Sequence, residues 1–288
     1  MIDRSKIEQL VRTTLRELGS PAPAALPNTP RGTPVDANGA VLLGPDRGAN
    51  LATPFDGPAT KAMVAATPAR IAVGRVGTRY RTNTLLRFRA DHAAAKDAVM
   101  SEVDPQLIAK LGFVELDSRA ESKAHFLQRP DAGRALSDAA RTTLTQRLPS
   151  GMQLVVVYGD GLSAAALNQH QGTFHQALGR ELQARSIRAA EPALFVRHSR
   201  VKVMDEICRL LGAEACLFVC GERPGLGYSD SMSAYYMYRP ASGVPTDADR
   251  EVISNINPRG LAPAQAAVAV ADACARILRE KKSGVVLG

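Results

Sequence analysis

The sequence predicts an α/β fold whose C-terminal half, residues 150–288, forms a Rossmann-like, doubly wound and mostly parallel sheet. In this half, apolar β-branched runs alternate with helical segments, and glycine-containing turns follow two of the runs, at 159–164 and 221–227. Alternating strands and helices favour parallel pairing, because a helix is the usual crossover between parallel strands. A smaller, mainly helical region and a tethered N-terminal amphipathic helix are expected to precede the sheet.

The N-terminal segment, residues 1–19, has apolar side chains such as Ile7, Leu10 and Leu15 at helical spacing and charges on the opposite face. Residues 20–59 are predicted to be a linker, because their many prolines, alanines and glycines oppose regular structure. The helix is therefore expected to be tethered outside the core, with its apolar stripe free to dock.

Residues 60–149 are predicted to be mainly helical. The run from Asn83 has the composition of a long helix, and Ser137 stands at the N-cap position of another. In the following region, residues 150–288, strands and helices alternate. The elements expected there are a strand and helix after Gly151, a strand at 192–196, a helix at 202–211 ended by Gly212, a strand at 215–219, an edge strand at 232–238 and a last helix at 264–282.

Composition excludes several classes of protein. The 288 residues contain no apolar run long enough to span a bilayer and no signal peptide at the N-terminus, so a cytoplasmic protein without a membrane segment is expected. The four cysteines lack metal-site spacing and are predicted to be buried, reduced thiols. The formal charge of +8 and the arginines in 70–89 would suit an anionic partner, but only Tyr80 and Phe88 provide aromatic rings there, which disfavours nucleic acid.

The turn at 159–164, GDGLSA, has the G-x-G-x-x-A spacing of a phosphate-binding turn between a strand and a helix. A dinucleotide site also requires an acidic residue after the second strand, whereas Arg197 and His198 stand there. NAD is therefore disfavoured, and an NADP-dependent oxidoreductase or another nucleotide-binding protein remains the alternative function.

No catalytic residue is predicted on this chain, because neither a nucleophile elbow nor a metal-binding histidine motif is present. His170 and His175 are expected at the surface. Glu222 and Asp230 are the two carboxylates suited to an acid/base pair, but carboxylates on loops more often accept hydrogen bonds, so neither is assigned a catalytic role.

The segment 217–238, LFVCGERPGLGYSDSMSAYYMY, is the strongest candidate for a binding site. Its apolar run stops at Glu222 and Arg223 within a glycine-punctuated loop. A carboxylate, a guanidinium and free backbone amides would then lie at the C-terminal edge of the sheet, where open α/β sheets bind ligands.

Long strings of the sequence resemble the small subunit of ethanolamine ammonia-lyase. They include IEQLVRTTL, GRVGTRYRTNTLLRFRADHAAAKDAV, VVVYGDGLS, FVRHSRVKVMDEI, GERPGLG followed by SDS, and GLAPAQAAVAVADACARIL. The resemblance implies the lighter partner of an adenosylcobalamin-dependent enzyme that converts ethanolamine to acetaldehyde and ammonia. It also implies a large TIM-barrel subunit that holds the substrate, with the cofactor between the two subunits in a higher assembly of paired subunits.

The resemblance further implies that cobalamin contacts fall on Val201 of SRVKV, Glu222 of GERPG and Val252, the residue before ISN. Relatives can carry cysteine at the position of Val252. Because a valine side chain has no polar atom, Val252 can offer the cofactor only a polar contact from its backbone. Arg200 or Arg223 is expected to meet the phosphate of the nucleotide loop or the partner. The cofactor is expected to keep its own benzimidazole base, and the N-terminal helix either directs the enzyme to a bacterial microcompartment or is a solubility-modulating tail.

Overall fold

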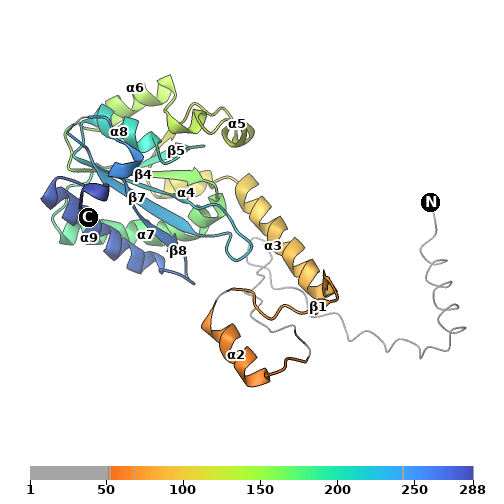
Figure 1. Ribbon diagram of the computed structural model, residues 1–288. Helices are drawn as coiled ribbons and strands as arrows, with labels where there is room; N and C mark the ends of the chain where they lie inside the picture. The colour runs from red at the N-terminus through yellow and green to blue at the C-terminus, as the bar shows by residue number, and fades with distance from the viewer. Residues whose placement is uncertain (1–50, 52, 68, 242, 288) are drawn as a thin grey trace, which may run out of the picture. The chain divides into compact units, whose positions relative to one another are not determined.

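The computed structural model of the protein describes residues 51, 53–67, 69–241 and 243–287 (Figure 1). Within them, a six-stranded sheet has the order β3-β5-β4-β6-β7-β8. Its strands are β3 (Val114–Asp117), β4 (Leu154–Gly161), β5 (Leu194–Arg197), β6 (Ala215–Gly221), β7 (Met232–Tyr238) and β8 (Glu251–Ile256). The helices are α2 (Gly57–Ala66), α3 (Thr82–Met100), α4 (Pro105–Lys110), α5 (Lys123–Gln128), α6 (Asp138–Arg147), α7 (Ala164–Ala184), α8 (Val203–Leu211) and α9 (Pro263–Glu280).

The sheet is mixed. The strands β3, β5, β4 and β6 are parallel, whereas β7 and β8 pair antiparallel with their neighbours. The predicted strand at 232–238 is confirmed as β7, but its predicted edge position is wrong, because β8 lies outside it. The mainly helical interpretation of 60–149 also missed β3, which pairs with β5 and forms the other edge of the sheet.

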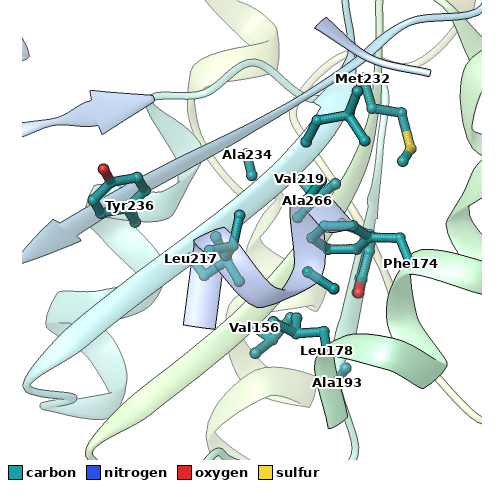
Figure 2. Close-up of a cluster of buried hydrophobic side chains, with 14 of the residues drawn as sticks. Val156, Phe174, Leu178, Ala193, Leu217, Val219, Met232, Ala234, Tyr236 and Ala266 are labelled. Atoms are coloured by element: carbon teal, nitrogen blue, oxygen red, sulfur yellow. The ribbon is translucent and has the colours of Figure 1, made fainter. Parts of the chain in front are cut away.

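Helices cover both faces of the sheet, α7 and α9 one face and α6 and α8 the other (Figure 1). Alternate residues of β4 belong to the two cores: Val156 packs on the α7 and α9 side and Val157 on the opposite side. Figure 2 shows the first core, in which Phe174 and Leu178 of α7 lie beside strand side chains such as Val156. Burial on both faces explains why β4 is apolar from Leu154 to Val157 rather than alternating.

Local signals set several helix ends as predicted. The Ser137 hydroxyl accepts a hydrogen bond from the Ala140 amide and caps α6. Helix α8 ends at Gly212, which has the left-handed conformation with φ of 59° that glycine adopts without steric cost. The predicted helix at 202–211 and the strand at 215–219 are thus confirmed, and the strand extends to Gly221.

All four cysteines are buried and free, as predicted. Burial raises the pKa of Cys208, Cys220 and Cys274 to about 12. Each thiol therefore stays protonated at neutral pH and unreactive toward electrophiles. Among the described residues, no helix combines the length and apolar character needed to cross a membrane.

The N-terminal predictions fall mainly outside the described residues. These are the amphipathic helix at 1–19 and most of the linker at 20–59. Helix α2 begins at Gly57, within the last residues of that predicted linker, and the carboxylate of Asp56 accepts a hydrogen bond from the Ala59 amide to cap it.

Candidate functional site

Two adjoining cavities lie beside the turn before α8: one of about 230 Å³ at the C-terminal ends of β4 and β6, and one of about 400 Å³ against β7 and the start of β8. Both are lined by Arg200, Val201 and Tyr235, so they form one crevice. The larger cavity is also lined by Pro130, Arg134, Lys202, Asp247, Arg250, Glu251 and Val252, and the smaller one by Gly161, Leu162, Ser199, Cys220, Gly221, Glu222, Arg223 and Ser233. The smaller cavity is therefore at the sheet edge where ligands of open α/β sheets bind, and the larger one continues the crevice toward β8.

The three residues to which the resemblance assigns cobalamin contacts, Val201, Glu222 and Val252, all line this crevice. Val201 lies in the turn before α8, which begins two residues later at Val203, one residue after the start at 202 that the sequence suggested. Val252 lies in β8 opposite Tyr235 of β7, and 45% of its surface is exposed. The fold thus brings together residues that are far apart in the sequence.

Glu222 follows directly after β6 and is fixed by its neighbours. Its Oε1 accepts hydrogen bonds of 2.7 Å from the Ser233 hydroxyl and from the Asn255 amide. Its backbone amide donates to the Ser231 carbonyl at 2.8 Å. Its other carboxylate oxygen, Oε2, accepts no hydrogen bond from any described residue. The carboxylate is therefore fixed in position through Oε1, while Oε2 remains an acceptor for a ligand.

Four basic side chains stand around the crevice without a carboxylate partner within 4 Å among the described residues: Arg134, Arg200, Lys202 and Arg223. The Arg200 guanidinium lies 4.4 Å from the centroid of the Phe126 ring, and its buried Nε has no hydrogen-bond acceptor in the described part of the chain. Burial, followed by the charges of Arg223 and Arg134, lowers the pKa of Arg200. This arrangement favours an anionic ligand, which would relieve the repulsion between the guanidinium groups.

A buried amino group adds to this positive charge. Lys123 of α5 is 7% exposed, and its Nζ has no hydrogen-bond partner among the described residues. Burial lowers the pKa of Lys123, and this effect outweighs the negative charges of Asp160 and Glu102, which raise it. Lys123 and Arg134 were missed from the sequence, where nothing indicates that α5 and the turn at 132–134 fold against the strand ends.

The GDGLSA turn does not have the open shape of a phosphate cradle. A Cβ atom on Gly159 would lie 2.1 Å from the Ser199 hydroxyl, and one on Gly161 would lie 2.4 Å from the Gly221 carbonyl oxygen. The glycines are therefore needed for packing against the protein itself. The intervening Asp160 carboxylate is buried and accepts a hydrogen bond from the Ser199 amide, and an acidic group at this place disfavours a bound phosphate.

The expectation of a surface position is wrong for His170, which is buried, and holds only in part for His175. His170 is 8% exposed, and its Nε2 lies 3.3 Å from Oδ2 of Asp230. His175 is half-buried, with Nδ1 3.1 Å from the Tyr158 hydroxyl. Asp230 also accepts a 2.6 Å hydrogen bond from Arg259. Since the Asp230 carboxylate is held by these two side chains and the Glu222 carboxylate by Ser233 and Asn255, the structure does not support an acid/base pair of Glu222 and Asp230.

Replacement of Asp230 by asparagine is expected to lower the free energy of unfolding at pH 7 by about 2 kcal/mol, because charge-assisted hydrogen bonds to two partners are weakened. Burial tends to raise the pKa of Asp230, but the hydrogen bond from His170 and the charge of Arg259 outweigh it and hold the pKa below 3.8. A depressed pKa stabilises the folded state above pH 3.8, and this stabilisation disappears as the pH falls through the folded-state pKa.

Acid unfolding curves check this expectation. The difference between wild type and Asp230→Asn should shrink below pH 3.8, whereas Asp97→Asn, an exposed change on α3, should match wild type throughout. A difference that stays constant down to acid unfolding would contradict the assignment of the stabilisation to the ionised carboxylate.

Comparison with known proteins identifies the family. The family model described as "Ethanolamine ammonia-lyase light chain" matches residues 58–288. An ethanolamine ammonia-lyase small subunit of Clostridium acetobutylicum is 39% identical over 225 residues, which cover 78% of this chain and 92% of that relative. One from Clostridioides difficile is 40% identical over 234 residues, covering 81% and 79% respectively. The resemblance noted in the sequence is thereby confirmed, and the chain belongs to the family of ethanolamine ammonia-lyase light chains, the small subunits of an ammonia-lyase.

Proposed function

We propose that this chain binds adenosylcobalamin at an interface with a large TIM-barrel subunit, within an enzyme that converts ethanolamine to acetaldehyde and ammonia. The observation that carries the proposal is the convergence of Val201, Glu222 and Val252 on one crevice, which runs from the C-terminal ends of β4 and β6 to β8. The layered arrangement, with parallel strands β3 to β6 and helices on both faces, supports the Rossmann-like assignment of this part of the chain.

The chemistry of the crevice fits one face of the cofactor. The free Oε2 of Glu222 would accept a hydrogen bond from an amide side chain of the corrin, and Arg200 or Arg223 would bind the phosphate of the nucleotide loop. Val201, Tyr235 and Val252 provide apolar contact surface. A cavity of about 400 Å³ is too small to enclose a corrin with its nucleotide, which supports binding between two subunits.

The residues of this chain would position the cofactor and exclude water rather than handle the substrate. Bound adenosylcobalamin supplies the radical chemistry, which a protein orients and protects. The described side chains that line the crevice are aliphatic, aromatic, basic, carboxylate, hydroxyl or thiol groups without an imidazole. These groups would hold the cofactor through hydrogen bonds, ion pairs and apolar contacts. We assign the substrate contacts and any acid/base residue to the large subunit.

Reconstitution tests the proposed function. We expect this chain to co-purify with a large subunit of the same enzyme when adenosylcobalamin is present. We also expect acetaldehyde to be released from ethanolamine only when both chains are present. Full activity of the large subunit alone would overturn the proposal. Quenching of nicotinamide fluorescence by the isolated chain would instead support the nucleotide-binding alternative, which the filled glycine turn disfavours.

We also propose that residues 1–19 direct the assembled enzyme into a bacterial microcompartment. Its basis is the amphipathic spacing of their apolar side chains in the sequence. Removal of residues 1–20 should then disperse the enzyme from the compartment and leave its activity intact. Unchanged localisation of the truncated enzyme would contradict targeting and favour a role as a solubility-modulating tail.

A further inference from the structure

Residues 70–100, here called the basic arm, comprise the hairpin of β1 (Arg75–Val76) and β2 (Arg79–Tyr80) followed by α3. The arm is held by ion pairs and ring contacts. The Asp91 carboxylate lies 2.5 Å from Arg70 and 3.0 Å from Arg87. The rings of Tyr80 and Phe88 meet edge to face, with centroids 5.3 Å apart, and the Arg70 guanidinium lies over the Phe88 ring. These contacts fix the shape of the arm with little apolar burial.

The apolar side chains of the arm remain exposed. Of the thirteen exposed large apolar side chains among the described residues, eight lie in 51–100. On the arm these are Val76 (68% exposed), Leu86 (58%), Met100 (53%), Leu85 (41%) and Tyr80 (39%). Concentration of exposed apolar groups in one segment, rather than their scatter over the surface, is typical of a protein interface.

The arm is also strongly basic. Residues 70–100 contain seven basic and two acidic side chains, so they account for much of the chain's charge of +8. Arg79, Arg81 and Arg89 have no carboxylate within 4 Å in the described part of the chain. The exposed apolar groups are therefore accompanied by cations that lack internal counter-ions.

The arm connects to the α/β body at two places. At the C-terminal end of α3, Ala95 and Ala98 are buried, and the side chain of Asn168 on α7 bonds the Glu102 carbonyl and the Asp104 amide just beyond the helix. Toward the hairpin, α3 leads away from the body (Figure 1). The Arg70 side chain donates to the Leu226 carbonyl in the loop that follows Glu222, so the base of the arm adjoins the loop that borders the crevice.

We propose that the basic arm is a docking surface for the large subunit, which would present acidic side chains around an apolar groove. This inference rests on the proposed function, and it names the surface of this chain to which the large subunit binds. Docking there would place the large subunit beside the 222–231 loop and hence beside the crevice that would bind the cofactor. Because the arm lies within the matched residues 58–288, it is part of the family's common region.

Two other occupants fit the arm less well. A second copy of this chain would bring two equally basic arms together, and like charges across an interface oppose association. Nucleic acid would pair with the arginines, but exposed Val76, Leu85 and Leu86 offer aliphatic surface to which phosphates do not bind. Aliphatic and basic groups together fit a protein surface that is apolar and acidic.

The test measures assembly of the two full-length subunits without adenosylcobalamin, so that cofactor binding does not enter. We expect Leu86→Asp and the double variant Arg79→Glu with Arg89→Glu each to weaken assembly by tenfold or more, the latter also with a smaller salt dependence. Matched controls are Val268→Asp on α9, at a side chain that is 39% exposed, and Arg180→Glu on the exposed face of α7. Both controls should assemble as wild type does.

The outcomes separate the two proposals. Arm variants that fold normally, judged by unchanged melting temperature, and assemble as wild type would overturn the docking surface while leaving the proposed function intact. The docking surface would also be overturned if the controls weakened assembly as much as the arm variants do. The same holds if the arm variants only abolished self-association of this chain or its binding to a polyanion. A wild-type chain that fails to bind the large subunit would overturn both proposals.

Discussion

Glu222→Ala is expected to raise the adenosylcobalamin concentration that the assembled enzyme needs for half-maximal activity by roughly ten- to a hundredfold, which corresponds to about 1.5–3 kcal/mol for a hydrogen bond to a charged group. In the structure, Oε1 of Glu222 is occupied by Ser233 and Asn255, and Oε2 is left for a ligand. Removal of the carboxylate should therefore weaken cofactor binding more than turnover at saturating cofactor. Titration of the cofactor into the reconstituted complex measures both quantities.

Glu222→Gln provides the matched control for the position of this side chain. The amide oxygen of glutamine can keep the hydrogen bonds from Ser233 and Asn255, while the negative charge is lost. We expect Glu222→Gln to need an adenosylcobalamin concentration for half-maximal activity that lies between those of wild type and Glu222→Ala. Replacement of Glu280, a carboxylate at the end of α9, should have no effect. A cofactor requirement that is unchanged in Glu222→Ala would contradict the site.

Gly221→Ala is expected to destabilise the protein by about 3 kcal/mol and to lower its melting temperature by roughly 6–12 °C. A Cβ atom at this position would lie 2.0 Å from the Ser163 carbonyl oxygen, at the junction of β6 with the start of α7. Backbone rather than a flexible side chain would have to move, so the crevice floor should distort as well. Thermal unfolding followed by circular dichroism measures the change.

Gly179→Ala is the control for the loss of a glycine. Gly179 lies inside α7, and a Cβ atom there would meet nothing within 4 Å. The change should raise stability by about 0.5–1 kcal/mol, since glycine is less favourable than alanine within a helix. If Gly221→Ala and Gly179→Ala had effects of the same sign, close packing at Gly221 would not explain the first result.

The predictable parts of the fold are those whose signals are local. The cap at Ser137 and the end of α8 at Gly212 depend on residues a few positions away, and both were predicted. Strand β3 was not, because Val114–Asp117 is short and becomes a strand only by pairing with β5, about eighty residues later. The edge position was assigned to β7 for the same reason, since only tertiary pairing places β8 outside it.

The candidate site could be predicted in part. Glu222 stood out because a charge interrupts an apolar run, and the crevice followed from the general geometry of open sheets. Val201 and Val252 came from the resemblance alone, since an isolated valine carries no chemical signal. Arg200 and Arg223 were candidates for the same role, whereas Arg134 could not be predicted, because it comes from a third segment with no local signal. The glycine turn was open to a phosphate interpretation because the sequence does not show which atoms occupy the space beside a glycine.

The burial of every natural cysteine has a practical consequence for spectroscopy. All four thiols of the 288-residue chain lie inside the fold. A single cysteine introduced at Val268, an exposed position on α9 outside the basic arm, would therefore be the preferred target of a maleimide or spin label, with no natural cysteine removed. A label there would report on the α/β body during assembly without placing a bulky group on the proposed docking surface.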